Sequence, residues 1–392
     1  MALQDAAAKL GLSVRQARRL LRAVEERDAR GLVHGNRGRT PPNRTDEEVR
    51  KKVLAWVAED GTYCGLNDTH LCELLAEREG IQIGRETLRS LLRQAGFRAK
   101  RRRRPRQHHR RRERSAVKGL MVLWDGSPHR WLGPQCPELT LMAAVDDADG
   151  ELLAAFFVPN ETTEAYLRLL QDILTRRGVP ASIYQDRHGA LRRNDDRWSL
   201  EEQLAGRQHP TQVGQALEDL AIRAIFALSP QAKGRIERLF ATLQDRLLAE
   251  LRLARIGSLD QANRFLADSW IDRYNRRFQK RSAKAGSAYR PVARLDLRRI
   301  LAFRYPATVL NDNTVRLGGL ILDIPPGPRR RSYAQAHVDV RQHLDGSWTV
   351  YYQDQPIANA PASPLAEPLR YRTHRSKRRS KGAPQEHFVY LP

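Results

Sequence analysis

Three acidic residues of this 392-residue chain stand where their carboxylates could gather for metal-dependent chemistry. Asp125 follows a short apolar run at 120–124, and the Gly-Ser-Pro sequence after it predicts a buried strand that ends in a turn. Asp186 ends a second strand predicted at 181–186, and Glu237 lies on a predicted helix after a third strand. Carboxylates from two strand ends and a helix suit a two-metal site for phosphoryl transfer, with two Mg²⁺ or Mn²⁺ ions.

Each of these acids also has an ordinary structural explanation. Asp125 would be a turn aspartate before Gly126. Glu237 lies at the rim of an apolar helical stripe, one turn after Lys233, with which it would form a surface ion pair. The common placement of the acids at element ends favours the metal site. Turn chemistry explains a second acidic sequence, which we leave outside the site: Asp146, Asp147 and Asp149.

The charge of the chain indicates its partner. A net charge of +24 predicts a polyanion, and double-stranded DNA is the simplest one. No apolar run approaches the roughly 18 residues of a membrane span, and the N-terminus lacks a signal-peptide pattern. The three cysteines show no metal-type spacing and no disulfide framework. We therefore expect a cytoplasmic, nucleoid-associated protein.

Residues 1–34 have the pattern of a helix-turn-helix DNA-binding module. Gly11 marks the turn, and Ser13 with Gln16 forms a capping box for the second helix. The apolar positions Val14, Ala17, Leu21 and Val24 are expected to face inward. The opposite face would enter a major groove as a recognition helix does, and it is almost purely arginine: Arg15, Arg18, Arg19 and Arg22.

A second helix-turn-helix-like module is predicted at 45–97, with a third helix near 85–94 that carries candidate DNA contacts at Arg85, Arg89 and Arg93. Residues 98–118 form a basic linker, because a block of like charge does not fold alone. This linker would add salt-sensitive affinity for phosphates. Its densest part is a run of four arginines: Arg101, Arg102, Arg103 and Arg104.

The core at 119–280 alternates strand and helix patterns. Three strands are followed by a helix, a strand, a helix, a strand and a long helix, with a charged insertion at 188–207. This is the order of the ribonuclease H-like fold. The expected strands are at 120–125, 139–146, 151–158, 181–186 and 222–228, and the expected helices are at 163–177, 211–220, from 232 and at 259–278.

The C-terminal part changes character. Short apolar runs broken by turn sequences predict a small β-barrel at 300–358, and a basic tail at 359–392 is expected to be disordered, although its apolar end at 388–391 could dock on the core. We therefore expect a multidomain α+β protein. It would have N-terminal helix-turn-helix modules, a ribonuclease H-like α/β catalytic core and a small C-terminal β-barrel.

Four segments carry a resemblance to a known family: the strand end at Asp125, Tyr-Gln-Asp-Arg-His-Gly at 184–189, Thr-Gln-Val-Gly-Gln-Ala-Leu at 211–217, and the specific Ser-Pro-Gln-Ala-Lys-Gly-Arg-Ile-Glu-Arg-Leu-Phe at 229–240. The chain resembles the DDE transposases of bacterial insertion sequences, most of all the ISNCY-type branch. Their catalytic core is similar to those of retroviral integrase and Mu transposase. The resemblance covers roughly residues 1–300.

The resemblance implies roles for particular residues. Asp125 would bridge two metal ions, while Asp186 and Glu237 would each complete one of them. Water would first cut at the ends of a mobile element, and the freed 3′ hydroxyl would then attack target DNA. Lys233 and His188 would lie near the scissile phosphate. Related enzymes act on paired DNA ends, so a homodimer or higher multimer is expected on DNA.

One departure and two rival functions stay open. The spacing from Asp186 to Glu237 is longer than in integrases, and Glu218 is nearer the usual distance, but the residues around Glu218 lack the family pattern. The insertion at 188–207 accounts for the surplus. The rivals are a DNA-binding regulator whose core no longer catalyses and a ribonuclease H-like, structure-selective DNA nuclease. Two N-terminal modules favour the transposase, since such a nuclease reads DNA shape instead of sequence.

Overall fold

The structure is a computed structural model that describes residues 2–33, 37, 44–100, 112–193, 198–227, 234–363 and 386–388. The chain divides into two compact units, Met1–Arg102 and Arg103–Pro392. Each unit is described by itself.

The first unit begins with α1 (Leu3–Lys9), α2 (Val14–Arg27) and a short 3-10 helix, Asp28–Leu32. The predicted turn is confirmed, because Gly11 has a φ of 64°. The Ser13 hydroxyl accepts from the Gln16 amide at 3.2 Å, which is one of the two hydrogen bonds of the predicted capping box. The predicted inward face is wrong in part, since Leu21 is 49% exposed and Val14 is 37% exposed. Two short helices share a single seam, which leaves most of the stripe uncovered.

The three helices predicted in the second module are confirmed: α3 (Glu47–Val57), α4 (Asp68–Arg78) and α5 (Arg85–Gln94). Three helices enclose a common centre, and this module accordingly buries a full set of apolar side chains. They are Val53, Tyr63, Leu71, Leu74, Leu75, Leu88, Leu91 and Leu92.

The second unit contains a five-stranded sheet in the order β3-β2-β1-β4-β5. Its antiparallel half is β1 (Val122–His129), β2 (Leu139–Asp146) and β3 (Leu152–Val158), and its parallel half adds β4 (Ser182–Gln185) and β5 (Arg223–Phe226) beside β1. This mixed order is the one expected of a ribonuclease H-like core. The predicted strands all form.

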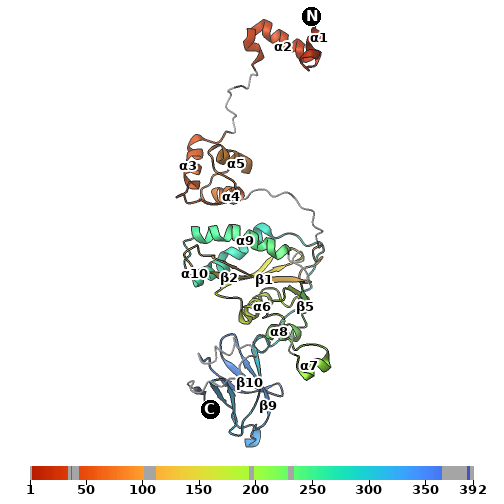
Figure 1. Cartoon of the computed structure of the whole chain (residues 1–392), viewed down its shortest axis with the longest axis vertical. Coiled ribbons are helices and arrows are strands. Elements are labelled where there is room, and N and C mark those ends of the chain that lie inside the picture. The colour runs from red at the N-terminus through yellow and green to blue at the C-terminus, as the bar shows by residue number, and fades with distance from the viewer. Residues whose placement is uncertain are drawn as a thin grey trace. The chain divides into compact units, whose positions relative to one another are not determined.

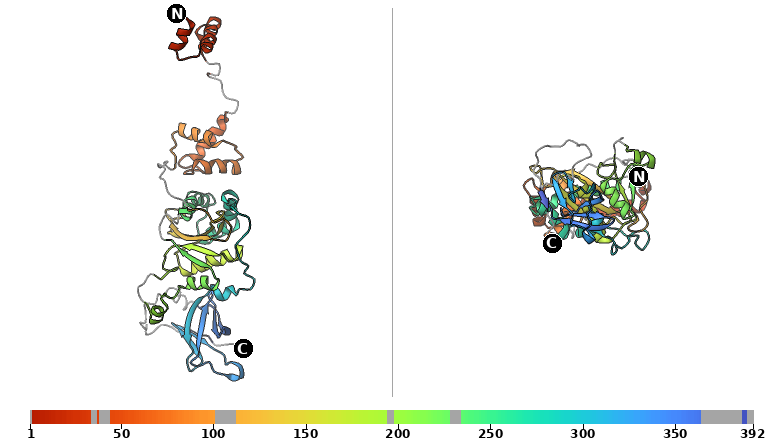
Figure 2. Two further views of the ribbon diagram at one scale, coloured as in Figure 1. Left: turned by 90° about the vertical axis from the view of Figure 1, so that its right-hand side faces the viewer. Right: turned by 90° about the horizontal axis from the view of Figure 1, so that it is seen from below.

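Helices cover both faces of this sheet (Figure 1). One face packs on α6 (Thr163–Arg177) and α8 (Gln212–Asp219). The other packs on α9 (Gly234–Leu253), α10 (Leu259–Phe265), a π-helical turn (Leu266–Trp270) and α11 (Ile271–Phe278). The left view of Figure 2 shows the same layers from the side.

Several predicted boundaries are wrong. β1 does not end at Asp125 but continues through Gly-Ser-Pro to His129, because β2 pairs with it along its whole length. Residues 112–118 are bound to the core through ion pairs and do not behave as linker. The charged insertion includes a capped helix, α7 (Leu200–Ala205). The core also extends beyond 280, where Ser287 and Arg290 form bridges with Lys118 and Val179.

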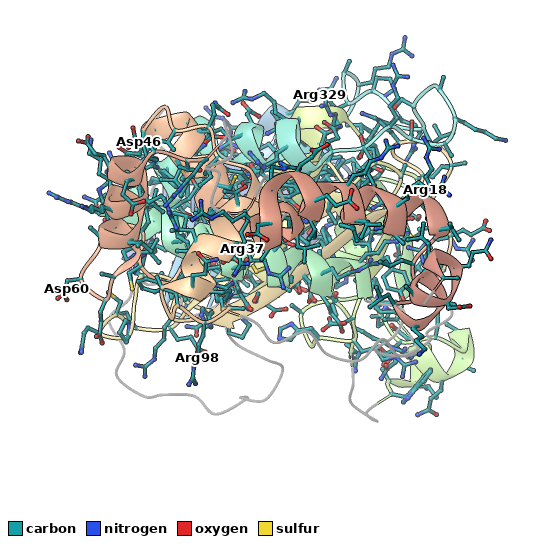
Figure 3. All side chains as sticks on the ribbon, turned by 90° about the horizontal axis from the view of Figure 1, so that it is seen from above. Arg18, Arg37, Asp46, Asp60, Arg98 and Arg329 are labelled. Carbon is teal, nitrogen blue, oxygen red and sulfur yellow. The ribbon has the colours of Figure 1, made fainter. Side chains whose placement is uncertain are left out.

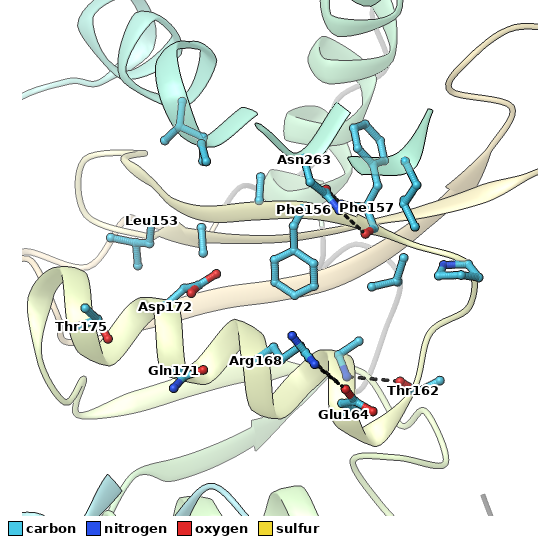
Figure 4. Close-up of a pocket in the computed structure, with 18 of the residues that line it drawn as sticks. Leu153, Phe156, Phe157, Thr162, Glu164, Arg168, Gln171, Asp172, Thr175 and Asn263 are labelled. Atoms are coloured by element: carbon cyan, nitrogen blue, oxygen red, sulfur yellow. Dashed lines mark hydrogen bonds and ion pairs between the residues drawn. The ribbon is translucent and has the colours of Figure 1, made fainter. Parts of the chain in front are cut away.

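The outer edge of β3 is covered by side-chain amides. Asn263 of α10 accepts from the Phe157 amide at 2.6 Å and donates to its carbonyl at 3.0 Å, and Asn275 of α11 makes the same pair of contacts with Leu152. Such caps block strand addition at an exposed edge. A cavity of about 820 Å³ lies beside this edge, between β3, α6 and α10, and its described lining includes none of the predicted site acids (Figure 4).

The C-terminal strands form two sheets around one core. One sheet has the order β11-β10-β9-β6, with β6 (Phe303–Thr308), β9 (His337–Gln342), β10 (Trp348–Tyr352) and β11 (Gln355–Ala360). The other joins β7 (Thr314–Leu317), β8 (Leu320–Asp323) and β12 (Glu386–Phe388), which is parallel to β8. Part of the tail predicted to be disordered is therefore a strand. Closure into a barrel stays a prediction.

None of the helices within the described ranges combines the length and the apolar character that crossing a bilayer requires.

Candidate active site

Asp125 lies within β1, and Asp186 directly follows the adjacent parallel strand β4. The two strands pair at Val122 with Ile183 and at Leu123 with Tyr184. One step further, the Trp124 indole nitrogen donates to the Gln185 side-chain oxygen at 3.0 Å. Continuing the register brings Asp125 beside Asp186, the first residue after β4. Both aspartates are half-buried.

The two aspartates lie on the side of the sheet that α9 covers. Side chains alternate between the faces of a strand. Leu123 and Tyr184 belong to the same apolar core as the buried face of α9. Asp125 and Asp186 follow these residues by two positions, so alternation directs them to the same side.

Glu237 lies on α9 between two contacts with the sheet. Near the start of the helix, Arg235 forms an ion pair with Asp147, which follows the end of β2. Further along, the Gln244 amide donates to the Ser127 hydroxyl of β1 at 3.2 Å. Glu237 precedes Gln244 by seven residues, close to two turns, so both point to the same side of the helix. Glu237 is exposed and lies on the helix that contacts β1 two residues beyond Asp125.

The alternative acid, Glu218, lies on the other side of the sheet. It is an exposed residue of α8. That helix buries Val213 and Leu217 against the core shared with Trp124. Glu218 is therefore on a helix that packs on the face opposite α9.

A fourth acid, Glu161, approaches the aspartates and was missed by the sequence analysis. Its carboxylate lies so close to Gly126 that an added Cβ would meet Oε2 at 2.7 Å. Tyr166 donates its hydroxyl to Glu161 at 2.5 Å. His188 lies 3.4 Å from Glu161 through Nδ1 and donates its backbone amide to Asp186 at 2.9 Å. The glycine directly after Asp125 is the one signal in the sequence for such a close approach.

The charges of these acids act on Tyr166. Burial, together with the charges of Glu161, Asp125 and Asp186, raises the pKa of Tyr166 well above its ordinary value. A neutral phenol that donates to one of several carboxylates is the expected form. His188, for which the family resemblance predicted a position near the scissile phosphate, is linked here to both Asp186 and Glu161.

The acids are not gathered into a finished metal cage. Across the described ranges, no three or more His, Cys, Asp or Glu side chains are grouped closely enough to hold an ion. The donor chemistry nevertheless fits a hard divalent cation, because the adjacent Asp125 and Asp186 supply carboxylate oxygens. Glu237 is the acid whose helix adjoins them on the same side.

The second acidic sequence is not explained by turn chemistry alone. Asp146, Asp147 and Asp149 are at most 1% exposed. Burial raises the pKa of Asp147 and of Asp149, but hydrogen bonds outweigh burial and leave both pKa values below the ordinary range. The donors are Arg112 and Arg235 for Asp147. They are Lys118 and Gln279 for Asp149. The pKa of Asp146 is raised, chiefly by burial.

Most of the predicted DNA-binding arginines are available to a ligand. Six are exposed on α2 and α5: Arg15, Arg18, Arg19, Arg22, Arg85 and Arg89, of which Arg18 is labelled in Figure 3. Arg93 is instead held within its module by Asp68 at 2.5 Å and by the Phe97 carbonyl. The remaining predicted contacts lie outside the described residues: Arg101, Arg102, Arg103, Arg104 and Lys233.

Solved structures that match the chain include two of viral proteins. The simian T-cell lymphotropic virus intasome in complex with PP2A regulatory subunit B56 gamma matches at 16% identity, with a TM-score of 0.32, over 76% of this chain and 93% of that chain. The magnesium complex of the HTLV-2 integrase catalytic core domain, in its dimeric form, matches at 15% identity, with a TM-score of 0.26, over 38% of this chain and 83% of that chain.

No family model matches the chain. Two curated proteins are similar to the chain in sequence, and both are named as transposases. y4bF of Sinorhizobium fredii (strain NBRC 101917 / NGR234) is 38% identical over 74% of this chain and 62% of its own length. The transposase for insertion sequence IS1202 of Streptococcus pneumoniae is 33% identical over 70% of this chain and 64% of its own length. The matches thus span less than two thirds of either relative. The chain is thus similar in sequence, over most of its length, to two bacterial proteins named as transposases.

Proposed function

We propose that the chain is a DDE transposase that binds the ends of a mobile element, cuts the DNA there and joins the freed 3′ ends to target DNA. One observation supports the proposal: the parallel register of β1 and β4, continued by two residues, brings Asp125 beside Asp186 on the side of the sheet covered by the helix of Glu237. The similarity to transposases supports the reaction class. Both the hydrolysis and the strand transfer are attacks of an oxygen on a phosphodiester.

Asp125, Asp186 and Glu237 are the residues that would hold divalent cations, two Mg²⁺ or Mn²⁺ ions. When bound, such ions stabilise the charge on the attacked phosphate and activate the attacking oxygen. Glu161 would keep the loop after β4 in place through His188, a residue of that loop whose backbone amide donates to Asp186. The site needs no covalent enzyme intermediate.

DNA recognition would be divided between two kinds of contact. The exposed arginines of α2 and α5 would read the element's end, because base contacts specify sequence. The part of the arginine-rich segment that precedes residue 112 would bind phosphates without regard to sequence. Removing the four arginines at 101–104 should lower the salt dependence of binding by up to about 0.9 per lost phosphate contact.

The decisive experiment supplies the purified chain with DNA that carries the terminal repeats flanking its gene. We expect Mg²⁺-dependent cleavage at the repeat boundary, then joined products with target DNA, and no reaction in EDTA. Sequence-specific binding without any cleavage would establish the DNA-binding regulator instead. Cleavage of branched DNA regardless of its sequence would establish the structure-selective nuclease.

Catalysis is proposed to need at least two chains on paired ends. A mixture of two inactive proteins tests this: one carries Asp125→Asn, and the other carries Arg15→Ala, Arg19→Ala and Arg89→Ala so that it cannot hold the end. Restored cleavage would show that one chain cuts the end bound by its partner. If both proteins fold and self-associate but the mixture stays inactive, action in trans is wrong.

A further inference from the structure

The turn after β2 contains an acid that the proposed reaction does not use. The side chain of Asp147 is 0% exposed. Arg112 binds it with both terminal nitrogens, at 2.7 and 3.1 Å, and Ser115 adds its amide and hydroxyl at 2.7 and 2.9 Å. A carboxylate so deeply buried needs charged partners, because an unpaired one would cost several kcal/mol.

The same carboxylate holds the first turn of α9. Arg235 donates a hydrogen bond from one terminal nitrogen to Asp147 and a second from the other terminal nitrogen to the backbone carbonyl of Arg112. The Arg235 side chain is only 16% exposed, so this contact is largely shielded from water. Glu237 follows Arg235 by two residues on the same helical turn.

We call Arg112, Ser115, Asp147 and Arg235 the Asp147 junction. It joins the C-terminal end of the arginine-rich segment, at residues 112–115, to the β2–β3 turn and to α9. It also reaches the strand that precedes Asp186, because the Arg112 guanidinium lies 6.0 Å from the centre of the Tyr184 ring. Segments distant in sequence therefore meet at one buried charge.

We propose that Asp147 is a positioning residue that fixes the first turn of α9, and with it Glu237, relative to β1. Through Arg112, the junction couples the position of Glu237 to the entry of the arginine-rich segment into the core. The inference rests on the proposed role of Glu237 and goes beyond it. The candidate acids are not gathered into a cage, so the placement of this helical turn decides whether the third acid can join the two aspartates.

The test is hydrogen exchange of amides 238–241, the first in α9 that bond to carbonyls of the described helix, in the full chain without metal or DNA. We expect Asp147→Asn and Arg235→Met each to raise their exchange by about tenfold or more, as local opening becomes easier. In the double variant these amides should exchange little faster than in either single variant, because both substitutions remove the same ion pair. If Asp147→Asn does not fold, Arg235→Met carries the test.

Asp149→Asn is the matched control. Asp149 lies in the same turn and is equally buried, but it pairs with Lys118 at 2.8 Å and with Gln279 at 2.6 Å, not with α9. Its variant should leave amides 238–241 unchanged. Unchanged exchange in the Asp147 and Arg235 variants, or an equal rise in the Asp149 variant, would overturn the proposal.

A kinetic readout separates this proposal from the proposed function. Asp147→Asn should slow single-turnover cleavage while leaving the Kd for DNA unchanged, and Asp147→Glu should restore part of the rate. If exchange rises as expected but cleavage does not respond, the junction holds the helix and the role of Glu237 is wrong. If Glu237→Gln abolishes cleavage but exchange never changes, the role of Glu237 survives and the junction is wrong.

Discussion

The core contains two groups of acids on one sheet, and their surroundings differ. The site acids, Asp125, Asp186 and Glu237, are half-buried or exposed. The turn acids, Asp146, Asp147 and Asp149, are almost completely buried. The turn acids are bound by internal donors: Arg112 and Arg235 on Asp147, Lys118 on Asp149, and the Tyr289 hydroxyl at 2.8 Å on Asp146.

The contrast shows how a fold assigns different roles to identical side chains. A buried carboxylate with its own arginine or lysine has its charge balanced inside the protein, so it contributes to stability and geometry. A carboxylate at a strand end with access to solvent can bind an external cation. Four experiments with substituted proteins test this division.

The largest expected effect follows the loss of a strand-end charge. Asp125→Asn or Asp186→Asn should lower Mg²⁺-dependent cleavage on the order of 10³-fold or more, since a neutral amide cannot replace a charged group at a preorganised site. The melting temperature and the Kd for DNA should stay close to the wild-type values. Single-turnover cleavage, thermal unfolding and a binding titration measure these. Near-normal cleavage in either variant would remove that aspartate from the site.

The third acid can be decided by a pair of variants. Glu237→Gln should abolish cleavage to a similar extent, and Glu218→Gln should have no effect, because α8 and α9 lie on opposite faces of the sheet. Both glutamates are exposed, so neither change should destabilise the fold. The reverse result would move the third ligand to Glu218 and contradict the assignment of faces.

A turn acid should affect stability instead of chemistry. Asp149→Asn should lower the free energy of unfolding by about 2 kcal/mol, less than for a fully buried pair, because Lys118 is 33% exposed. The folded state has a lowered pKa at Asp149, so its stabilisation is present above the unfolded pKa of about 3.9 and is lost as pH falls through the folded pKa. Urea unfolding at pH 7 and pH 3 should therefore show a smaller difference from wild type at pH 3. If Asp149→Asn lowers the cleavage rate per folded molecule, the division between turn acids and site acids is wrong.

The smallest effect comes from two matched hydroxyl deletions. Tyr166 donates to Glu161 beside the site acids, whereas Tyr289 donates to Asp146 among the turn acids. Tyr166→Phe and Tyr289→Phe should each cost about 1 kcal/mol of stability. Only Tyr166→Phe should also slow cleavage, by about fivefold, which corresponds to about 1 kcal/mol in the barrier. Equal cleavage rates in the two variants would show that Glu161 does not act on the site.

The sequence predicted the elements of the core well because their periodic patterns are strong. The strand at 139–146 and the helix at 163–177 form with the predicted bounds, since both bury long apolar sets. It failed at β1, where Gly-Ser-Pro reads as a turn. Pairing with β2 overrides that local preference and extends the strand to His129. The prediction for the first module failed for a different reason. Its apolar stripe exists, but two helices cannot cover it.

Local patterns were enough to predict which acids follow which strands, because strand ends and helical stripes are local properties. Helical periodicity also predicted the arginine faces of α2 and α5. The tertiary structure was needed to bring Asp125 beside Asp186 through the register of β1 and β4, to place Glu161 against Gly126, and to join Arg112 and Arg235 through Asp147. These contacts depend on strand register and on segments far apart in the chain, and no local pattern encodes a distance between such segments.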